Sequence, residues 1–211
     1  MFEVEYKGGN GVVIASKKTT LFIDPKLSLV GLKDLVPKNA IELGTESRLM
    51  VNNPDATLII EGPGEYEVGD FTLKGVAAVR HIDTEDDGKA STIYRLECGD
   101  IRLAVIGNIA DKLSDEQYEA IGVVDIVILP VGGGGYTLDP TSAAGIVRSI
   151  EPKVVIPIHY AESGLRYEVP QESLDVFTKE LGAPVESMGK VKLKSQAALP
   201  PVLTVYELAR S

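Results

Sequence analysis

The chain is poor in cysteine and has no long hydrophobic run. Its single cysteine, Cys98, excludes an intramolecular disulfide, and this fits a reducing compartment. No apolar stretch approaches the roughly 20 residues that a membrane-spanning helix needs. The first ten residues lack the basic and apolar regions of a signal peptide. We therefore expect a cytoplasmic protein without a membrane anchor.

Positive charge is also scarce. The 211 residues include 21 lysines and arginines against 31 aspartates and glutamates, which gives a formal net charge of −10. This charge repels nucleic acid and anionic membranes, so we expect neither as a partner. The remaining partner classes are a small molecule or a protein, including a second copy of the chain in a homo-oligomer.

The length and an apolar content of 44% fit a single domain over residues 1–211 with a sizeable core. The first half shows strand patterns, and these lie at 2–7, 12–15, 21–23, 56–60, 66–68, 71–79, 92–98 and 101–106. The second half alternates strands with helices. Its strands are predicted at 123–129, 154–158 and 202–208, and its helices at 115–121, after Asp139 and at 171–181. Residues 26–53 have no clear pattern. This order predicts an α/β protein built as a layered sandwich.

Three sequence patterns resemble functional sites, but a structural role is favoured for each. The glycines at 132–135 precede a helix, but their spacing fits no nucleotide fingerprint, so a tight turn is favoured over a phosphate site. The acidic run Asp83–Gly88 lacks the final glutamate of a calcium loop, which favours a solvated loop. Cys98 shares a strand face with apolar residues and is predicted to be a core residue rather than a nucleophile.

The two histidines of the chain follow apolar strand patterns directly. His81 comes after the strand at 71–79, and His159 ends the strand at 154–158. Asp24 also stands at a strand end, because Pro25 cannot continue a central strand. A catalytic zinc needs about three protein ligands, so two histidines fall short unless a carboxylate joins them. Asp24, Asp83 and Glu65 are the candidate carboxylates, although Glu65 is interpreted here as a turn residue.

Several motifs together resemble the metallo-β-lactamase superfamily, in particular its small bacterial metal-dependent hydrolase-like branch. The resemblance runs from about Phe2 to Gly182, and its motifs are Phe22-Ile23-Asp24-Pro25, Gly62-Pro63-Gly64-Glu65-Tyr66-Glu67-Val68, Val105-Ile106-Gly107-Asn108, residues 128–134 and residues 152–160. It implies a four-layer αβ/βα sandwich with a metal site at the sheet edge.

The metal residues of that family carry over unevenly. His81 and His159 match two of its metal-binding histidines, and Asp24 matches an early aspartate that supports the site. Asn108 stands where the family has a bridging aspartate. The signature His-x-His-x-Asp-His has no counterpart, because Thr45–Met50 aligns with it and contains no histidine. A neutral Asn108 cannot bridge two dications, so the two-metal mechanism is not expected.

Two hypotheses follow from this departure. The favoured one is a protein of the metallo-β-lactamase fold that has lost its metal site and acts as a binding, structural or regulatory domain, with no cofactor. The alternative is a residual hydrolase of an ester, amide or phosphoester, with one zinc or other divalent ion held by His81 and His159. In the alternative, Asp24, Asp83 or Glu65 helps to hold the ion. Asp24 and Asn108 are otherwise interpreted as vestigial site positions, and no residue is assigned as catalytic.

Overall fold

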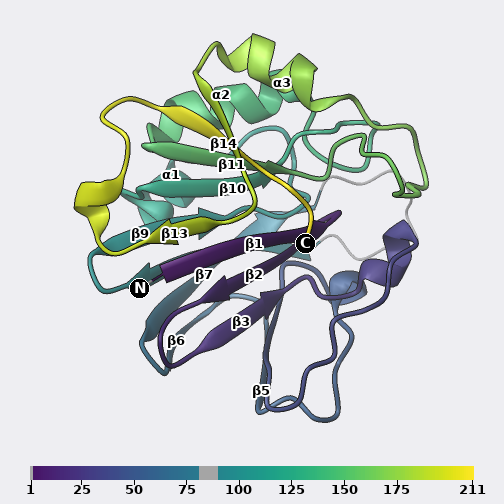
Figure 1. Ribbon diagram of the computed structural model, residues 1–211, viewed down its shortest axis with the longest axis vertical. Coiled ribbons are helices and arrows are strands. Elements are labelled where there is room, and N and C mark those ends of the chain that lie inside the picture. The colour runs from purple at the N-terminus through teal and green to yellow at the C-terminus, as the bar shows by residue number, and fades with distance from the viewer. Residues whose placement is uncertain (1, 81–89) are drawn as a thin grey trace.

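Two mixed β-sheets pack face to face and form the body of the molecule (Figure 1). The computed structural model describes residues 2–80 and 90–211. The six-stranded sheet has the order β13-β1-β2-β3-β4-β5. Its strands are β1 (Phe2–Gly8), β2 (Gly11–Ala15), β3 (Thr20–Ile23), β4 (Ile41–Gly44), β5 (Leu58–Glu61) and β13 (Val191–Leu193).

The eight-stranded sheet has the order β12-β14-β11-β10-β9-β8-β7-β6. Its strands are β6 (Gly64–Val68), β7 (Phe71–Val79), β8 (Ala90–Cys98), β9 (Ile101–Val105), β10 (Ile126–Pro130), β11 (Val154–Ile158), β12 (Val185–Met188) and β14 (Thr204–Leu208). Strands β9, β10, β11 and β14 run parallel, whereas β6 to β9 form antiparallel hairpins. This division matches the change of pattern along the sequence.

Two hydrophobic cores hold the layers together. One lies between the sheets, where Tyr6 and Ile14 of the smaller sheet belong to the same cluster as Leu103 and Ile128 of the larger one. The other lies between the larger sheet and the helices α1 (Asp115–Ile121), α2 (Pro140–Ile150) and α3 (Leu174–Leu181). The predicted αβ/βα sandwich is confirmed by these layers. No helix of the described residues is long and apolar enough to cross a membrane.

Helix ends follow the capping signals in the sequence. Ser114 and Gln117 form a reciprocal capping box on α1, and Asp139 accepts hydrogen bonds from the first turn of α2. Helix α3 differs from the prediction, because it begins at Leu174 rather than at Gln171. The Glu172 N–H donates to the Gly132 carbonyl at 2.7 Å, which holds the preceding segment in an extended path.

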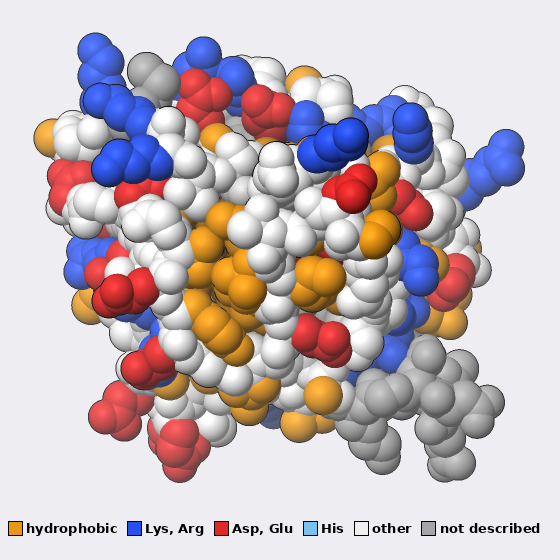
Figure 2. All heavy atoms as spheres, turned by 90° about the horizontal axis from the view of Figure 1, so that it is seen from below, with side chains coloured by type: hydrophobic (Ala, Val, Ile, Leu, Met, Phe, Trp, Pro, Cys, Tyr) orange, Lys and Arg blue, Asp and Glu red, His pale blue; other side chains and the backbone are white. Residues whose placement is uncertain are grey.

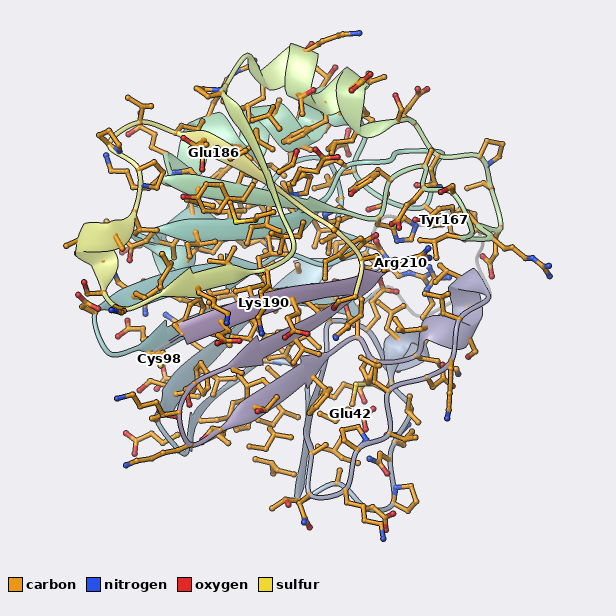
Figure 3. The ribbon with its side chains drawn as sticks, viewed as in Figure 1. Glu42, Cys98, Tyr167, Glu186, Lys190 and Arg210 are labelled. Carbon is orange, nitrogen blue, oxygen red and sulfur yellow. The ribbon has the colours of Figure 1, made fainter. Side chains whose placement is uncertain are left out.

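Strand β4 is the element that the sequence pattern concealed. It contains Glu42, which is 1% exposed on an otherwise apolar strand. The Glu42 carboxylate accepts the backbone N–H groups of Val51, Asn52 and Asn53 at 2.6, 2.9 and 2.9 Å. These bonds satisfy the buried charge, and they fold the loop after β4 back onto the sheet. Figure 3 labels Glu42 in the lower part of the molecule.

Lysines near the C-terminus join β13 to the neighbouring strand β1. Lys190 Nζ lies 2.7 Å from Glu3 Oε2 and 3.1 Å from Glu5 Oε1, and Lys192 Nζ lies 3.6 Å from Glu3 Oε1. These ion pairs join β13 to β1 on one solvated face. Cys98 is half-buried and packs against the core between the sheets.

Strand β5 ends the smaller sheet at the bottom of Figure 1. Figure 2 views the molecule from below and shows hydrophobic side chains gathered in a hollow, with charged side chains around it. On β5, Leu58 and Ile59 are 38% and 41% exposed. The edge strand is only four residues long and ends in Glu61, which limits its pairing with another strand.

Candidate functional site

The carboxyl ends of strands from both sheets meet at one end of the sandwich. Asp24 follows β3, Asn108 lies just beyond β9 and His159 follows β11. Asn10, in the turn between β1 and β2, reaches the same place. Clustering at the carboxyl ends of parallel strands is the usual position for a ligand site in sheets of this kind.

A chain of hydrogen bonds links the two sheets across this site. Asn10 Nδ2 donates to Asn108 Oδ1 at 3.3 Å, and Asn10 Oδ1 faces His159 Nδ1. Because the Asn10 amide presents its oxygen to the imidazole, the proton lies on His159 Nδ1. Burial, with the nearby positive charge of Arg48, lowers the pKa of His159 to about 3. His159 is therefore neutral, and its Nε2 carries a lone pair.

Asp24 is buried beside Thr45 on the neighbouring strand end. Its Oδ1 accepts the Thr45 N–H at 2.8 Å and its Oδ2 pairs with Thr45 Oγ1 at 2.7 Å. Burial raises the pKa of Asp24 to about 8, although both bonds from Thr45 oppose the change. Both bonds are donated by Thr45, and at neutral pH the Asp24 carboxyl is mainly protonated.

Asp24 and His159 share an unusual backbone conformation. Their φ angles are +50° and +49°, in the left-handed region that non-glycine residues seldom occupy. Such conformations cost about 1–3 kcal/mol each and concentrate at functional sites. Two of them in one cavity indicate a retained functional architecture.

A buried cluster of charges lies directly after β4, where the histidine signature of the resembled family would stand. Glu46 Oε2 lies 2.7 Å from Arg80 Nε and 3.2 Å from Arg48 Nε. Burial raises the pKa of Glu46, whereas the guanidinium groups of Arg80 and Arg48 oppose this rise. The Glu46 carboxylate thus contacts two guanidinium groups.

The other residues of the signature stretch have structural contacts. Thr45 binds Asp24, and Ser47 Oγ donates to Glu61 Oε1 at 2.6 Å. Leu49 and Met50 are buried, and Met50 packs against the backbone of Gly44. A short 3-10 helix, η2 (Ser47–Leu49), carries this stretch. The side chains of Thr45, Ser47, Leu49 and Met50 are therefore engaged in contacts within the protein.

Asn10, Asp24 and His159 border a cavity of about 40 Å3 that opens to solvent. One wall is apolar and is built mainly by the 3-10 helix η1 (Leu27–Val30), while the other wall is polar. The full lining comprises Gly8, Asn10, Asp24, Lys26, Leu27, Leu29, Val30, Arg48, Leu49, Tyr136, His159, Tyr167, Glu168, Val169 and Gln171.

Aromatic rings frame the cationic side of this cavity. The Arg48 guanidinium carbon lies 5.5 Å from the centre of the Tyr136 ring. The Tyr167 ring centre is 4.9 Å from that of His159, and Tyr167 donates its hydroxyl to the Tyr160 carbonyl at 2.7 Å. Tyr167 is labelled at the right of Figure 3 and marks this end of the sandwich.

The structure brings together three of the residues singled out from the sequence, namely Asp24, Asn108 and His159. His81 and the acidic run from Asp83 lie outside the described residues. Glu65 is exposed on β6 and does not line the cavity.

Several side chains of the cavity were not identified from the sequence. They are Asn10, Lys26, Arg48, Tyr136, Tyr167 and Gln171. Asn10 read as a turn residue and Gln171 as a helical one, because no local motif distinguishes a side chain that turns into a distant site. Only Arg48 could have been noticed in the sequence, because it lies in Thr45–Met50, the stretch that aligns with the His-x-His-x-Asp-His signature.

The donors described around His159 are amides rather than carboxylates. Within residues 2–80 and 90–211, no group of three or more His, Cys, Asp or Glu side chains lies close enough to share an ion. The near neighbours of His159 are the amide of Asn10 and, through it, that of Asn108. Neutral amides do not replace the carboxylate bridge that two dications need.

Fold and site position together define a protein of the metallo-β-lactamase fold. A family described as Beta-lactamase superfamily domain matches residues 3–159, and the chain belongs to it. This assignment confirms the superfamily resemblance seen in the sequence motifs.

Solved structures share the fold at low sequence identity. A Thermotoga maritima protein, described as a candidate Zn-dependent hydrolase of the metallo-β-lactamase superfamily, is similar with a TM-score of 0.74 and 22% identity, over 99% of this chain and 100% of that one. A metallo hydrolase from Ignicoccus hospitalis gives a TM-score of 0.62 and 17% identity, over 92% of this chain and 99% of that one.

Curated relatives are similar over part of their length. A UPF0173 metal-dependent hydrolase of Thermococcus onnurineus is 31% identical over 117 residues, which are 53% of this chain and 50% of the relative. A UPF0173 protein of Pyrococcus abyssi is 29% identical over 128 residues, which are 58% of this chain and 57% of the relative. The chain thus spans about half the length of the curated relatives it matches.

Proposed function

We propose that this chain is a metallo-β-lactamase-fold domain that binds a small molecule at the cavity beside His159, without a dinuclear metal centre and without metal-dependent hydrolysis. The observation that carries the proposal is the buried cluster of Glu46, Arg48 and Arg80. It places guanidinium groups where the family signature would place metal ligands.

The physical argument concerns charge. A dication close to Arg48 would be repelled, and the repulsion is strong where burial lowers the effective dielectric constant. Burial also leaves His159 neutral, which suits a hydrogen-bonding residue as well as a ligand. The bonds of Thr45 and Ser47 further commit the signature stretch to structural roles.

Elemental analysis of protein purified without chelator tests this proposal. We expect far less than one equivalent of zinc, manganese or iron per chain, and no gain after dialysis against zinc. The His159→Ala variant is the matched control, since its metal content should be the same as that of the unmodified protein. One or two equivalents of metal that His159→Ala removes would contradict the proposal.

The alternative function is a mononuclear hydrolase in which His81 and His159 hold one ion. Two observations favour it: the lone pair on His159 Nε2, and the description of the Thermococcus onnurineus relative as a metal-dependent hydrolase. This alternative requires that His81→Ala and His159→Ala each abolish metal binding and esterase or phosphodiesterase activity. Full metal content or activity in both variants would exclude it.

A further inference from the structure

The cations that border the cavity are the feature to explain. The chain as a whole is acidic, with a formal net charge of −10. Lys26 and Arg48 nevertheless both line this small cavity. Against them the lining holds two carboxyl groups, of which Asp24 is bonded to Thr45 and Glu168 is exposed at the rim.

Arg48 is held in place on two sides and leaves its outer edge accessible. Its Nε lies 3.2 Å from Glu46 Oε2, and its guanidinium lies 5.5 Å from the Tyr136 ring centre. Nη1 has only a loose contact with Glu168, at 3.9 Å, and the Glu168 side chain is 55% exposed. A cation fixed in this way loses little freedom when it binds an anion, so it is prepared for one.

Lys26 offers a second positive charge to the same cavity. Within the described parts of the chain its ammonium group makes no ion pair, whereas Arg48, the other cation of the lining, contacts Glu46. The residue is half-buried and directly precedes η1, which builds the apolar wall. A charged group and an apolar surface therefore stand side by side.

The apolar wall determines the rest of the ligand. Leu27, Val30 and Leu49 are buried and line the cavity, with Leu29 half-buried beside them. A purely ionic ligand would leave this surface in contact with water, whereas a short alkyl or aryl group would cover it. The cavity of about 40 Å3 opens to solvent, so a short chain can fill it and extend into the opening.

We infer that the cavity binds a small organic carboxylate, with its charged group at Arg48 and Lys26 and its apolar part against η1. This inference rests on the proposed function and names the ligand class for the same site. A carboxylate matches the planar guanidinium fork. A single negative charge also suits a rim on which Glu168 would repel a more highly charged anion.

Calorimetric titration with three probes of equal length tests the inference: hexanoate, hexanol and hexylamine, each with and without EDTA. We expect hexanoate to bind at least about tenfold more tightly than hexanol, since bonds to charged groups are the stronger ones. Hexylamine should not bind. Equal affinity for hexanoate and hexanol, or no hexanoate binding, would overturn the inference.

Variants then test which side chains bind the carboxylate group of hexanoate. Lys26→Met and Arg48→Met should each weaken hexanoate by about tenfold and leave hexanol unchanged, while Glu168→Gln should strengthen hexanoate a few-fold. Lys33→Met, at an exposed lysine outside the cavity, is the matched control and should change nothing. Arg48→Met removes a partner of Glu46 and can therefore destabilise the fold. If it does not fold, Lys26→Met and Glu168→Gln still test the assignment. Hexanoate binding that none of the three alters would refute the assignment.

The EDTA arm separates this inference from the proposed function. If the protein is metal-free and hexanoate does not bind, only the ligand class is wrong. If the protein holds stoichiometric zinc and EDTA abolishes hexanoate binding, the anion binds through the metal, and the proposed function is wrong as well. Binding that EDTA leaves unchanged, in protein that holds no stoichiometric metal, supports both.

Discussion

Replacing Asp24 by asparagine should make the protein more stable at alkaline pH. Burial raises the pKa of Asp24 to about 8, so the folded state keeps a proton that the unfolded chain releases near its ordinary value of 3.8. Between these two pH values the folded state binds more protons than the unfolded state. The free energy of unfolding therefore falls as pH rises through this window.

The magnitude follows from the width of the window. Each pH unit within it costs up to about 1.4 kcal/mol, so the carboxyl could remove up to roughly 4 kcal/mol between pH 5 and pH 8. Water entry and local relaxation reduce such values, and we expect about 2–4 kcal/mol. Asp24→Asn keeps both contacts with Thr45, because its oxygen accepts the Thr45 N–H and its amide donates to the Thr45 hydroxyl.

Urea unfolding at pH 5, 6, 7 and 8 measures this effect. The variant and the unmodified protein should be similar at pH 5, and the variant should be more stable by about 2–4 kcal/mol at pH 8. Asp55→Asn, at an exposed carboxyl with no side-chain hydrogen bond to a described residue, is the control and should run parallel to the unmodified protein. A constant difference between Asp24→Asn and the unmodified protein across this range would refute the assigned burial of a protonated carboxyl.

Other variants test the packing around the site by the same unfolding assay. Asn108→Asp places a second carboxylate against Glu46 and should cost about 2–4 kcal/mol at pH 7; an unchanged midpoint would contradict this. Glu46→Gln should cost about 3–5 kcal/mol because it removes a buried carboxylate that pairs with Arg48 and Arg80, whereas a gain in stability would show that the cluster is strained. Gly44→Ala should cost about 1–3 kcal/mol, since its Cβ would overlap the Met50 side chain, and Met50→Ala should relieve that clash in the double variant. Phe177→Ala should cost about 3–5 kcal/mol by opening the core under α3, and a loss below 1 kcal/mol would argue against that packing.

Much of the fold was predictable because its signals are local. The alternation at 2–7, the apolar run at 154–158 and the caps Ser114 and Asp139 all reappear in the structure, and the apolar run predicted at 123–129 appears as the strand Ile126–Pro130. Strand β4 was concealed because Glu42 interrupts its apolar run, and the charge is satisfied by N–H groups of a later loop. The start of α3 moved because its first residues bind Gly132 instead of continuing the helix. In both cases a tertiary contact overrode the local pattern.

The site was predictable only where it consisted of strand ends. Asp24 and His159 follow apolar strands, so their convergence could be expected from the order of the elements. The hydrogen bond that links the two sheets at the site joins Asn10 of the smaller sheet to His159 of the larger one. These two residues are 149 positions apart in the sequence. No spacing rule predicts a contact at that separation, and the same is true of Tyr136 and Tyr167 on the cavity rim.

The loss of the metal centre that we propose is compatible with the fold because of where the site lies. Both cores are built from residues within strands and helices, while the site residues lie beyond the strand ends. Exchanging a buried carboxylate for Asn108 removes one negative charge, and placing Arg48 beside Glu46 supplies a positive one where a cation would have stood. Such coupled changes keep the buried charge balanced, whereas either half of the exchange alone would leave an uncompensated ion. We therefore expect histidines introduced at Thr45 and Ser47 to fail to create a zinc site until Arg48 is also removed, a result that zinc titration of the two- and three-residue variants would establish.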